Sequence, residues 1–195
     1  LKKVSQQLEA NFKKGIRAVA VVFFHAYAFQ EHEKLIGEIA HKIGFEQISL
    51  SHQVMPMVKM VARGDTTTVD AYLTPHIQNY LNSFRSGFSD NLKDTQLLFM
   101  QSDGGLTNSN NFKGCNAILS GPAGGVVGYA MTSSISEDNT GISDSNHNLQ
   151  TTRHQLPVIG FDMGGTSTDV SRYGEDFELV HETETAGVRI QAPQI

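Results

Sequence analysis

The most informative segment of this sequence, residues 160–170, reads Gly160-Phe161-Asp162-Met163-Gly164-Gly165-Thr166-Ser167-Thr168-Asp169-Val170. The runs on either side of the two glycines are typical of strands, so residues 157–162 and 168–173 are predicted to form an antiparallel hairpin. Paired glycines at a strand end let backbone N–H groups approach a phosphate closely, because no Cβ stands in the way. The segment therefore predicts a phosphate-binding turn, with contacts from Gly164, Gly165, Thr166, Ser167 and Thr168.

Two carboxylates, Asp162 and Asp169, flank this turn. Mg²⁺ is commonly held by one or two carboxylates together with water and substrate phosphates, so both are candidate metal ligands and candidate catalytic groups. Asp169 could instead orient a nucleophile. The loop has no lysine and leads into a strand, which argues against a Walker-type loop and a dinucleotide-binding turn. An ordinary hairpin is the competing interpretation, but a turn needs neither the aspartates nor the three hydroxyls.

The N-terminal part is predicted to form a strand, helix and strand after a first helix. Apolar spacings of three and four residues indicate amphipathic helices over residues 2–14 and 31–43, and Gly44 can end the second one. The continuous apolar run at residues 18–24 is typical of a strand covered on both faces. A second strand over residues 46–50 should lie parallel to it, because a helix connects the two.

The middle of the chain predicts a long helix and two more strands. Residues 66–88 keep a helical apolar period, which Pro75 should end or kink near Thr74. Residues 97–100 are interpreted as a buried strand, and residues 117–119 as a short one.

A second glycine-rich segment, Ser120-Gly121-Pro122-Ala123-Gly124-Gly125, follows the predicted short strand and precedes an apolar helix. A strand-to-helix turn exposes N–H groups at a helix N-terminus, where anions are favoured. Gly121, Gly124 and Gly125 are therefore candidate phosphate contacts, and close packing of the helix on a sheet is the alternative. The segment Ser102-Asp103-Gly104-Gly105 lies at another strand end, where it forms either a ligand contact or a turn.

Other reactive side chains are interpreted as structural. Cys115 has no histidine beside it in sequence, which favours an inert thiol over a nucleophile. Lys59 and Arg63 are isolated basic residues, which are usually solvated. The histidines lack metal-ligand spacing and are interpreted as packing or surface residues: His25, His32, His41, His52 and His76.

Length, charge and cysteine content bound the class of protein. The 195 residues, 39% of them hydrophobic, suffice for one globular domain. The net charge of -5 predicts no nucleic-acid partner, and the longest apolar run is too short to cross a membrane. The single cysteine excludes an intrachain disulfide and fits a reducing compartment such as the cytosol.

The sequence divides into three parts. Residues 1–131 form the predicted α/β portion, and residues 157–195 form a β-meander with residues 177–184 as its last strand. Residues 132–156 are rich in Ser, Thr, Asn and Asp without an apolar period, which predicts a flexible polar insertion. Both ends look cut from a longer chain, so the sequence is interpreted as an interior fragment.

Residues 162–169 resemble the phosphate-binding hairpin of the actin, sugar-kinase and Hsp70 superfamily of ATPases. Their form is most similar to the hydantoinase A and 5-oxoprolinase family, and within it to the eukaryotic-type 5-oxoprolinases, which are several times longer. The resemblance covers nearly the whole chain outside residues 132–155. Its upstream segments include Asp70-Ala71-Tyr72-Leu73-Thr74-Pro75, Phe99-Met100-Gln101-Ser102-Asp103-Gly104-Gly105-Leu106 and Ala117-Ile118-Leu119-Ser120-Gly121-Pro122-Ala123-Gly124-Gly125.

This resemblance implies an α/β fold of the actin-like (ribonuclease H-like) class, with a mixed sheet flanked by helices and an antiparallel meander at its end. It also implies an ATP-dependent hydrolase that opens the lactam of 5-oxo-L-proline to L-glutamate. Asp162 and Asp169 would position Mg²⁺, while the amides of Gly164 and Gly165 and the hydroxyls of Thr166 and Thr168 would hold the phosphates of ATP.

The expected partners are a small cyclic amide and the remainder of the same polypeptide. Whether the protein forms a homodimer is left undecided by the sequence. The fragment alone should be inactive, because family members carry an earlier phosphate loop and a further large catalytic region. Two alternatives remain. One is a hydantoinase or ketone carboxylase subunit of the same family, and the other is a non-catalytic nucleotide-binding module of the Hsp70 kind.

Overall fold

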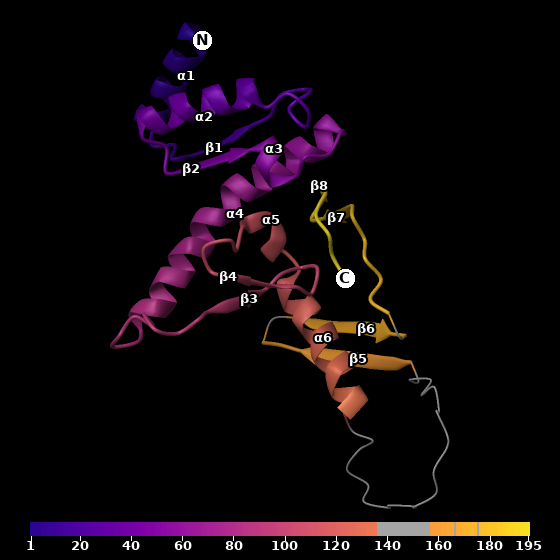
Figure 1. Cartoon of the computed structure of the whole chain (residues 1–195). Helices are drawn as coiled ribbons and strands as arrows, with labels where there is room; N and C mark the ends of the chain where they lie inside the picture. Colours follow the sequence, from indigo (N-terminus) through magenta and orange to yellow (C-terminus); the bar gives the residue numbers. More distant parts are fainter. Residues whose placement is uncertain (136–156, 166, 175) are drawn as a thin grey trace, which may run out of the picture.

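The structure is a computed structural model that describes residues 1–135, 157–165, 167–174 and 176–195. The described strands form four separate two-stranded sheets, of which one is parallel and three are antiparallel (Figure 1). Within the described residues, the predicted single mixed sheet is therefore not formed, although the α/β character is. A search of the described helices found none with the length and apolarity that a bilayer crossing requires.

The N-terminal unit has the predicted order of helix, strand, helix and strand, but its first strand ends at Val21 rather than continuing to residue 24, and Phe24 is exposed. Helix α1 spans Lys2–Lys13 and α2 spans Glu31–Ile43, and Gly44 ends α2 in the left-handed region with a φ of 109°. Strands β1 (Ala18–Val21) and β2 (Gln47–Leu50) pair in parallel. Val21, Ile36 and Leu50 form the buried core between this sheet and α2.

The opposite face of this sheet is covered by α4 (Figure 1). Successive residues of a strand point to opposite faces, so Leu50 packs on α2 while Ser49 faces α4. The Ser49 hydroxyl accordingly donates a hydrogen bond of 2.7 Å to Asp70 of α4. The short helix α3 (Ser51–Val54) joins β2 to this region.

Helix α4 spans Met60–Ser86 and is longer than the sequence predicted. It begins before residue 66 and continues past Thr74, so of the two predicted effects of Pro75, an end or a kink, the end is wrong. Buried side chains lie on both sides of the proline, Ala71 before it and Leu81 after it. Tertiary packing therefore offsets the loss of one backbone hydrogen bond at Pro75.

The middle segment differs most from the prediction. Strands β3 (Leu98–Met100) and β4 (Leu106–Asn108) form an antiparallel hairpin, and β3 is not buried, since Leu98 is exposed. The predicted strand at 117–119 is instead the end of α5 (Gly114–Ala117) and the turn into α6. Two N–H groups at the start of α5 are fixed by α4, because Gly114 donates to Thr74 Oγ1 and Cys115 donates to Asp70 Oδ1.

Helix α6 spans Ser120–Ile135, so it begins at Ser120 and reaches beyond the boundary predicted at residue 132. The rest of the predicted insertion, residues 136–156, lies outside the described residues.

The C-terminal segment contains two hairpins rather than one continuous meander. Strands β5 (Val158–Met163) and β6 (Thr168–Tyr173) pair antiparallel as predicted. The predicted strand at 177–184 is wrong in extent, because only Val180 forms a bridge, with Gln194, before β7 (Thr183–Thr185) pairs with β8 (Val188–Ile190). Ala186 and Gly187 between β7 and β8 both have positive φ, which makes the tight turn of this hairpin.

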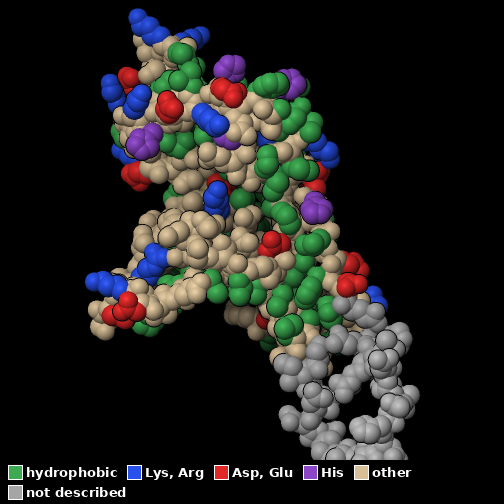
Figure 2. Space-filling view, viewed as in Figure 1, with side chains coloured by type: hydrophobic (Ala, Val, Ile, Leu, Met, Phe, Trp, Pro, Cys, Tyr) green, Lys and Arg blue, Asp and Glu red, His purple; other side chains and the backbone are tan. Residues whose placement is uncertain are grey.

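Many large apolar side chains are exposed on the surface of the described residues. Figure 2 shows a band of hydrophobic side chains that runs from the part around α2 down towards the residues drawn in grey. One such group lies on the β5–β6 hairpin, where Ile159, Phe161, Met163 and Val170 are between 62% and 74% exposed. These four residues share the face of the hairpin that points away from α6.

Candidate functional site

The two aspartates of the predicted phosphate turn lie directly opposite each other. Asp162 of β5 and Asp169 of β6 are register partners, so their side chains stand on the same face of the hairpin. That face is the one covered by α6, because Gly160 and Ser171 on the same face both contact Tyr129 of α6. Two negative charges that face each other across paired strands repel each other, which favours a cation between them.

Helix α6 lies along this face with its N-terminal end towards the turn. Gly125 is next to Asp162, and Tyr129, one helical turn later, is next to Gly160. Asp162 is nearer the turn than Gly160, so the start of α6 points to the same end of the hairpin as Gly164 and Gly165. The partial positive charge of a helix N-terminus and the two carboxylates therefore share one end of the site.

The three candidate glycines of α6 have different surroundings. A Cβ on Gly125 would lie 2.8 Å from Oδ2 of Asp162, and one on Gly124 would lie 3.7 Å from the Met100 side chain. Gly121 is exposed in the first turn of the helix, with open space beside it. The prediction of a strand-to-helix loop at 120–125 is wrong, because these residues are helical, and the packing alternative describes Gly124 and Gly125.

The turn itself is described at all of its predicted contacts except Thr166, which lies outside the described residues. The N–H of Gly164 donates to the carbonyl of Ser167 at 3.0 Å, so this amide already has a partner within the hairpin. Gly165 is exposed, and neither glycine has a positive φ. The backbone conformation at these two positions therefore does not by itself require glycine.

Ser167 and Thr168, the two described hydroxyl-bearing residues of the turn, are exposed. Thr168 is the register partner of Met163, so its side chain stands on the face of the hairpin opposite to Asp162 and Asp169. Ser167 Oγ lies 3.4 Å from Oδ2 of Asp169, and Thr168 opens β6 with an exposed side chain. A cavity of about 360 Å³ runs along β6 from Asp169 to residues 176–178 and Val180 beyond the strand's far end. Pro122 and Val126 of α6 line it on one side, and residues 169–173 line it on the other.

These side chains fit a magnesium ion that is coordinated jointly by the protein and by phosphate. No group of three or more His, Cys, Asp or Glu side chains gathers around a point within the described part of the chain. Asp162 and Asp169 supply two carboxylates, and Mg²⁺ typically completes its octahedron with waters and substrate phosphates. These residues thus fit a nucleotide-bound Mg²⁺ better than a metal held by the protein alone.

Asp103 belongs to a turn in this structure. Its Oδ1 accepts a 2.8 Å hydrogen bond from the N–H of Gly105, and Gly104 has a φ of 78°. The Gly104 N–H donates to the carbonyl of Gln101, which closes the β3–β4 hairpin. These bonds support the turn interpretation of residues 102–105 over the ligand interpretation.

The structure contains a fully buried polar cluster that the sequence patterns did not predict. Glu33 and Arg63 are both 0% exposed, and Ser51 joins them by accepting from Arg63 Nε at 2.9 Å and donating to Glu33 Oε1 at 2.6 Å. The Nδ1 atom of His52 lies 2.7 Å from Glu33 Oε2. The interpretation of Arg63 as a solvated residue is therefore wrong, and the His52 side chain packs as expected.

This cluster stands at the carboxyl ends of β1 and β2, where open parallel sheets often bind ligands. Burial raises the pKa of the Glu33 carboxyl, but hydrogen bonds from Ser51, His52 and the Phe23 N–H outweigh burial, so the pKa lies below its usual value. Arg63 donates further to the backbone carbonyls of Phe23 and Phe24. The protein's own hydrogen-bonded chain of Arg63, Ser51 and Glu33 thus occupies this place and ties β1, α2 and α4 together.

Cys115 is buried beside Asp70, as the interpretation of an inert thiol requires. Burial, and then the charge and hydrogen bond of Asp70, raise the pKa of the thiol to about 12. The thiolate is the nucleophilic form of cysteine, so this side chain is unreactive near neutral pH.

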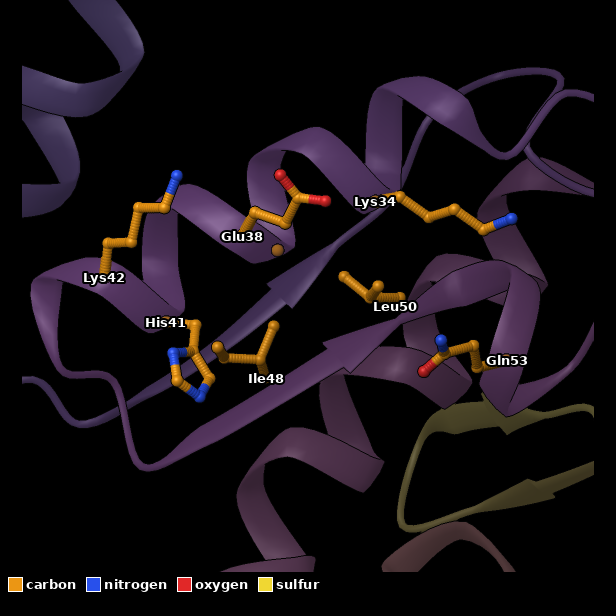
Figure 3. A pocket seen from close by; sticks show the side chains of 8 residues that line it. Lys34, Glu38, His41, Lys42, Ile48, Leu50 and Gln53 are labelled. Carbon is orange, nitrogen blue, oxygen red and sulfur yellow. The ribbon is translucent and has the colours of Figure 1, made fainter.

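A larger hollow lies elsewhere, on α2 and β2. It measures about 550 Å³ and has an apolar floor of Ile48 and Leu50 (Figure 3). Its rim consists of exposed polar side chains, among them Lys34, Glu38 and Lys42. None of the residues predicted to bind phosphate or metal lines it, so size alone does not make it the site.

Comparison with known proteins identifies relatives over nearly the full chain. The model of the "Hydantoinase/oxoprolinase" family matches residues 63–144 and 146–195, and that of the "Hydantoinase/oxoprolinase N-terminal region" matches residues 1–44. A 5-oxoprolinase of Dictyostelium discoideum is 54% identical over 99% of this chain, and one of Saccharomyces cerevisiae is 49% identical over 96%. The chain spans only 15% and 13% of the lengths of these two relatives.

Two solved structures have a similar fold. The nucleotide-free structure of an acetone carboxylase superposes with a TM-score of 0.76 at 18% identity, over 99% of this chain and 26% of that one. The ATP-dependent caprolactamase of Pseudomonas jessenii superposes with a TM-score of 0.74 at 24% identity, over 98% of this chain and 26% of that one. At these identities the likeness describes the fold alone.

Proposed function

Because the chain belongs to the hydantoinase/oxoprolinase family, we propose that it is part of an enzyme that opens the lactam of 5-oxo-L-proline to L-glutamate with hydrolysis of ATP. The observation that carries this proposal is the identity of about one half to relatives named 5-oxoprolinase. The paired carboxylates of Asp162 and Asp169 beside the N-terminus of α6 agree with a site for nucleotide phosphates.

The chemistry explains why ATP is needed. A lactam amide is stabilised by resonance, and transfer of the terminal phosphoryl group of ATP to its carbonyl oxygen, with release of ADP, makes the carbonyl carbon electrophilic. Water then adds to this carbon, the C–N bond breaks and the nitrogen leaves as the amine. A second water hydrolyses the resulting acyl phosphate to the side-chain carboxylate of glutamate and phosphate. In this mechanism Asp162 and Asp169 would hold the magnesium that accompanies ATP, and the first turn of α6 would face the phosphate charge. The hydroxyls of Thr166, Ser167 and Thr168 are additional phosphate donors in the proposal.

The substrate is tested by ADP formation in the full-length protein. We expect ADP production to rise on addition of 5-oxo-L-proline and to be matched mole for mole by glutamate. A hydantoin, also a cyclic amide, serves as the matched alternative substrate. Preference for the hydantoin would assign the protein to the hydantoinase side of the family, and ADP production that no cyclic amide or ketone stimulates would favour the Hsp70-like alternative.

We also propose that the remainder of the polypeptide covers the outer face of the β5–β6 hairpin, defined by Ile159, Phe161, Met163 and Val170. Contiguous apolar surface on a sheet is usually covered, and the relatives are several times longer than this chain. Met163 should therefore react with hydrogen peroxide much more slowly in the native full-length protein than after denaturation, as measured by sulfoxide formation in mass spectrometry. Equal rates would show that this face is open to solvent.

The actin-like fold class, the three-part division of the chain and a cytosolic location remain proposals of the same kind. Homodimer formation also stays a prediction, which the mass of the full-length protein in light scattering would check.

A further inference from the structure

Helix α6 and strand β5 meet at two matched positions. Gly125 and Tyr129 are four residues apart on the helix, a rise of about 6 Å. Asp162 and Gly160 are two residues apart on the strand, a rise of about 6.8 Å. Because these spacings nearly agree, Tyr129 lies on Gly160 while Gly125 lies beside Asp162.

Tyr129 contacts both strands of the hairpin. Its ring lies directly over Gly160, where any Cβ would overlap the ring atoms. Its hydroxyl lies 2.6 Å from Oγ of Ser171, which is the register partner of Gly160 on β6. The next pair towards the turn on the same face is Asp162 with Asp169. The tyrosine therefore holds the two strands one step away from the two carboxylates.

We propose that Tyr129 is a positioning residue for the carboxylate pair, a role that rests on the proposed ATP-dependent function. Its ring sets how closely α6 approaches β5, and its hydroxyl sets the position of β6 along the helix. Together these contacts keep Asp162 at the gap left by Gly125 and keep Asp169 opposite it. The geometry of the metal-binding oxygens then depends on a side chain that touches neither metal nor nucleotide.

This role predicts a selective defect for Tyr129→Phe in the full-length protein. The variant keeps the ring on Gly160 and loses only the hydrogen bond to Ser171. A hydrogen bond of this kind contributes about 0.5–1.5 kcal/mol, so the Mg²⁺ concentration that half-saturates ATP hydrolysis should rise about 2- to 12-fold. The KM for 5-oxo-L-proline and the melting temperature without nucleotide should stay at the wild-type values.

Two further variants test the hydrogen bond itself. Ser171→Ala should raise the half-saturating Mg²⁺ concentration by a similar factor, and the double variant should add little, because both changes remove the same contact. Tyr80→Phe is the matched control, since Tyr80 is 64% exposed on α4, and it should leave the Mg²⁺ dependence unchanged. Gly160→Ala, which drives the ring away from the strand, should give a larger increase than Tyr129→Phe.

The outcomes separate this inference from the proposed function. If the wild-type protein hydrolyses ATP but Tyr129→Phe and Ser171→Ala keep its Mg²⁺ dependence, the positioning role is overturned and the function stands. If both variants instead lower the melting temperature and shift all kinetic constants together, the tyrosine is only a packing residue and the role is again overturned. A wild-type protein without Mg²⁺-dependent ATP hydrolysis would remove the proposed function, and the positioning role with it.

Discussion

Asp162→Asn in the full-length protein should lower ATP hydrolysis and lactam opening together, by about 100- to 1,000-fold in kcat, the usual cost of removing one electrostatic contact to a transition state. Asparagine keeps the size of the side chain and its place beside Gly125, so the fold should not change. It removes one of two charges that are positioned to balance a divalent cation. Both rates can be followed in one reaction, as ADP and glutamate.

Asp94→Asn is the matched control for this variant. Asp94 is exposed in the connection between α4 and β3, far in the chain from the hairpin, so its loss should change neither rate. Wild-type turnover by Asp162→Asn would refute the assignment of this carboxylate. Loss of lactam opening alone, with ATP hydrolysis intact, would place Asp162 in the hydrolytic step rather than beside the nucleotide.

Asp169→Asn separates the two roles that remain open for that residue. If Asp169 only holds Mg²⁺, excess Mg²⁺ should restore part of the activity, because weaker binding is offset by concentration. If Asp169 orients a nucleophile, kcat should stay low at every Mg²⁺ concentration.

Arg63→Met should produce the largest loss of stability of any single change considered for this chain. The guanidinium is 0% exposed and bonds Ser51 and the carbonyls of Phe23, Phe24, Met57 and Val58. Its removal takes away the buried positive charge that Ser51 links to the Glu33 carboxylate and leaves the buried carbonyls without this donor, a loss of about 3–5 kcal/mol. Amide hydrogen exchange of β1 and β2 in the full-length protein would report this as a drop in local protection.

A surface arginine provides the comparison. Arg17 makes a long ion pair of 3.8 Å with Glu46, and its side chain is 45% exposed. Arg17→Met should therefore change the same protection by less than about 1 kcal/mol. Equal effects of the two substitutions would mean that the buried cluster does not stabilise the sheet. A double variant with Glu33→Leu should recover part of the loss, because no buried charge then remains unpaired.

Acid should lower the stability of β1 and β2, because the contacts of Glu33 favour its ionised form. The folded protein lowers the pKa of this carboxyl below its ordinary value of 4.5. A lowered carboxyl pKa stabilises the folded state fully above the unfolded value, and that stabilisation is lost as the pH falls through the folded value. Protection of β1 and β2 should therefore decline below about pH 4.5, and less steeply in the variant with Glu33→Leu.

Local patterns in the sequence were sufficient for the elements whose contacts are local. Residues 31–43 carry a helical apolar period and end at Gly44, and the structure places α2 at these bounds. The parallel pairing of β1 and β2 followed from the helix between them, and the β5–β6 hairpin followed from its two glycines. In each case the hydrogen-bond partners lie within one element or one connection, so nearby residues contain the information.

Distant contacts decided the rest, because they change the energy of a conformation that local propensity would not choose. Residues 117–119 are apolar enough for a strand, yet Asp70 and Thr74 of α4 hold the preceding N–H groups in a helical turn. Arg63 is charged and was expected in water, but the Ser51 hydroxyl links it to a buried carboxylate thirty positions earlier, Glu33. Tyr129 and Gly160 meet only when α6 folds onto the hairpin, so no pattern within either segment could predict that contact.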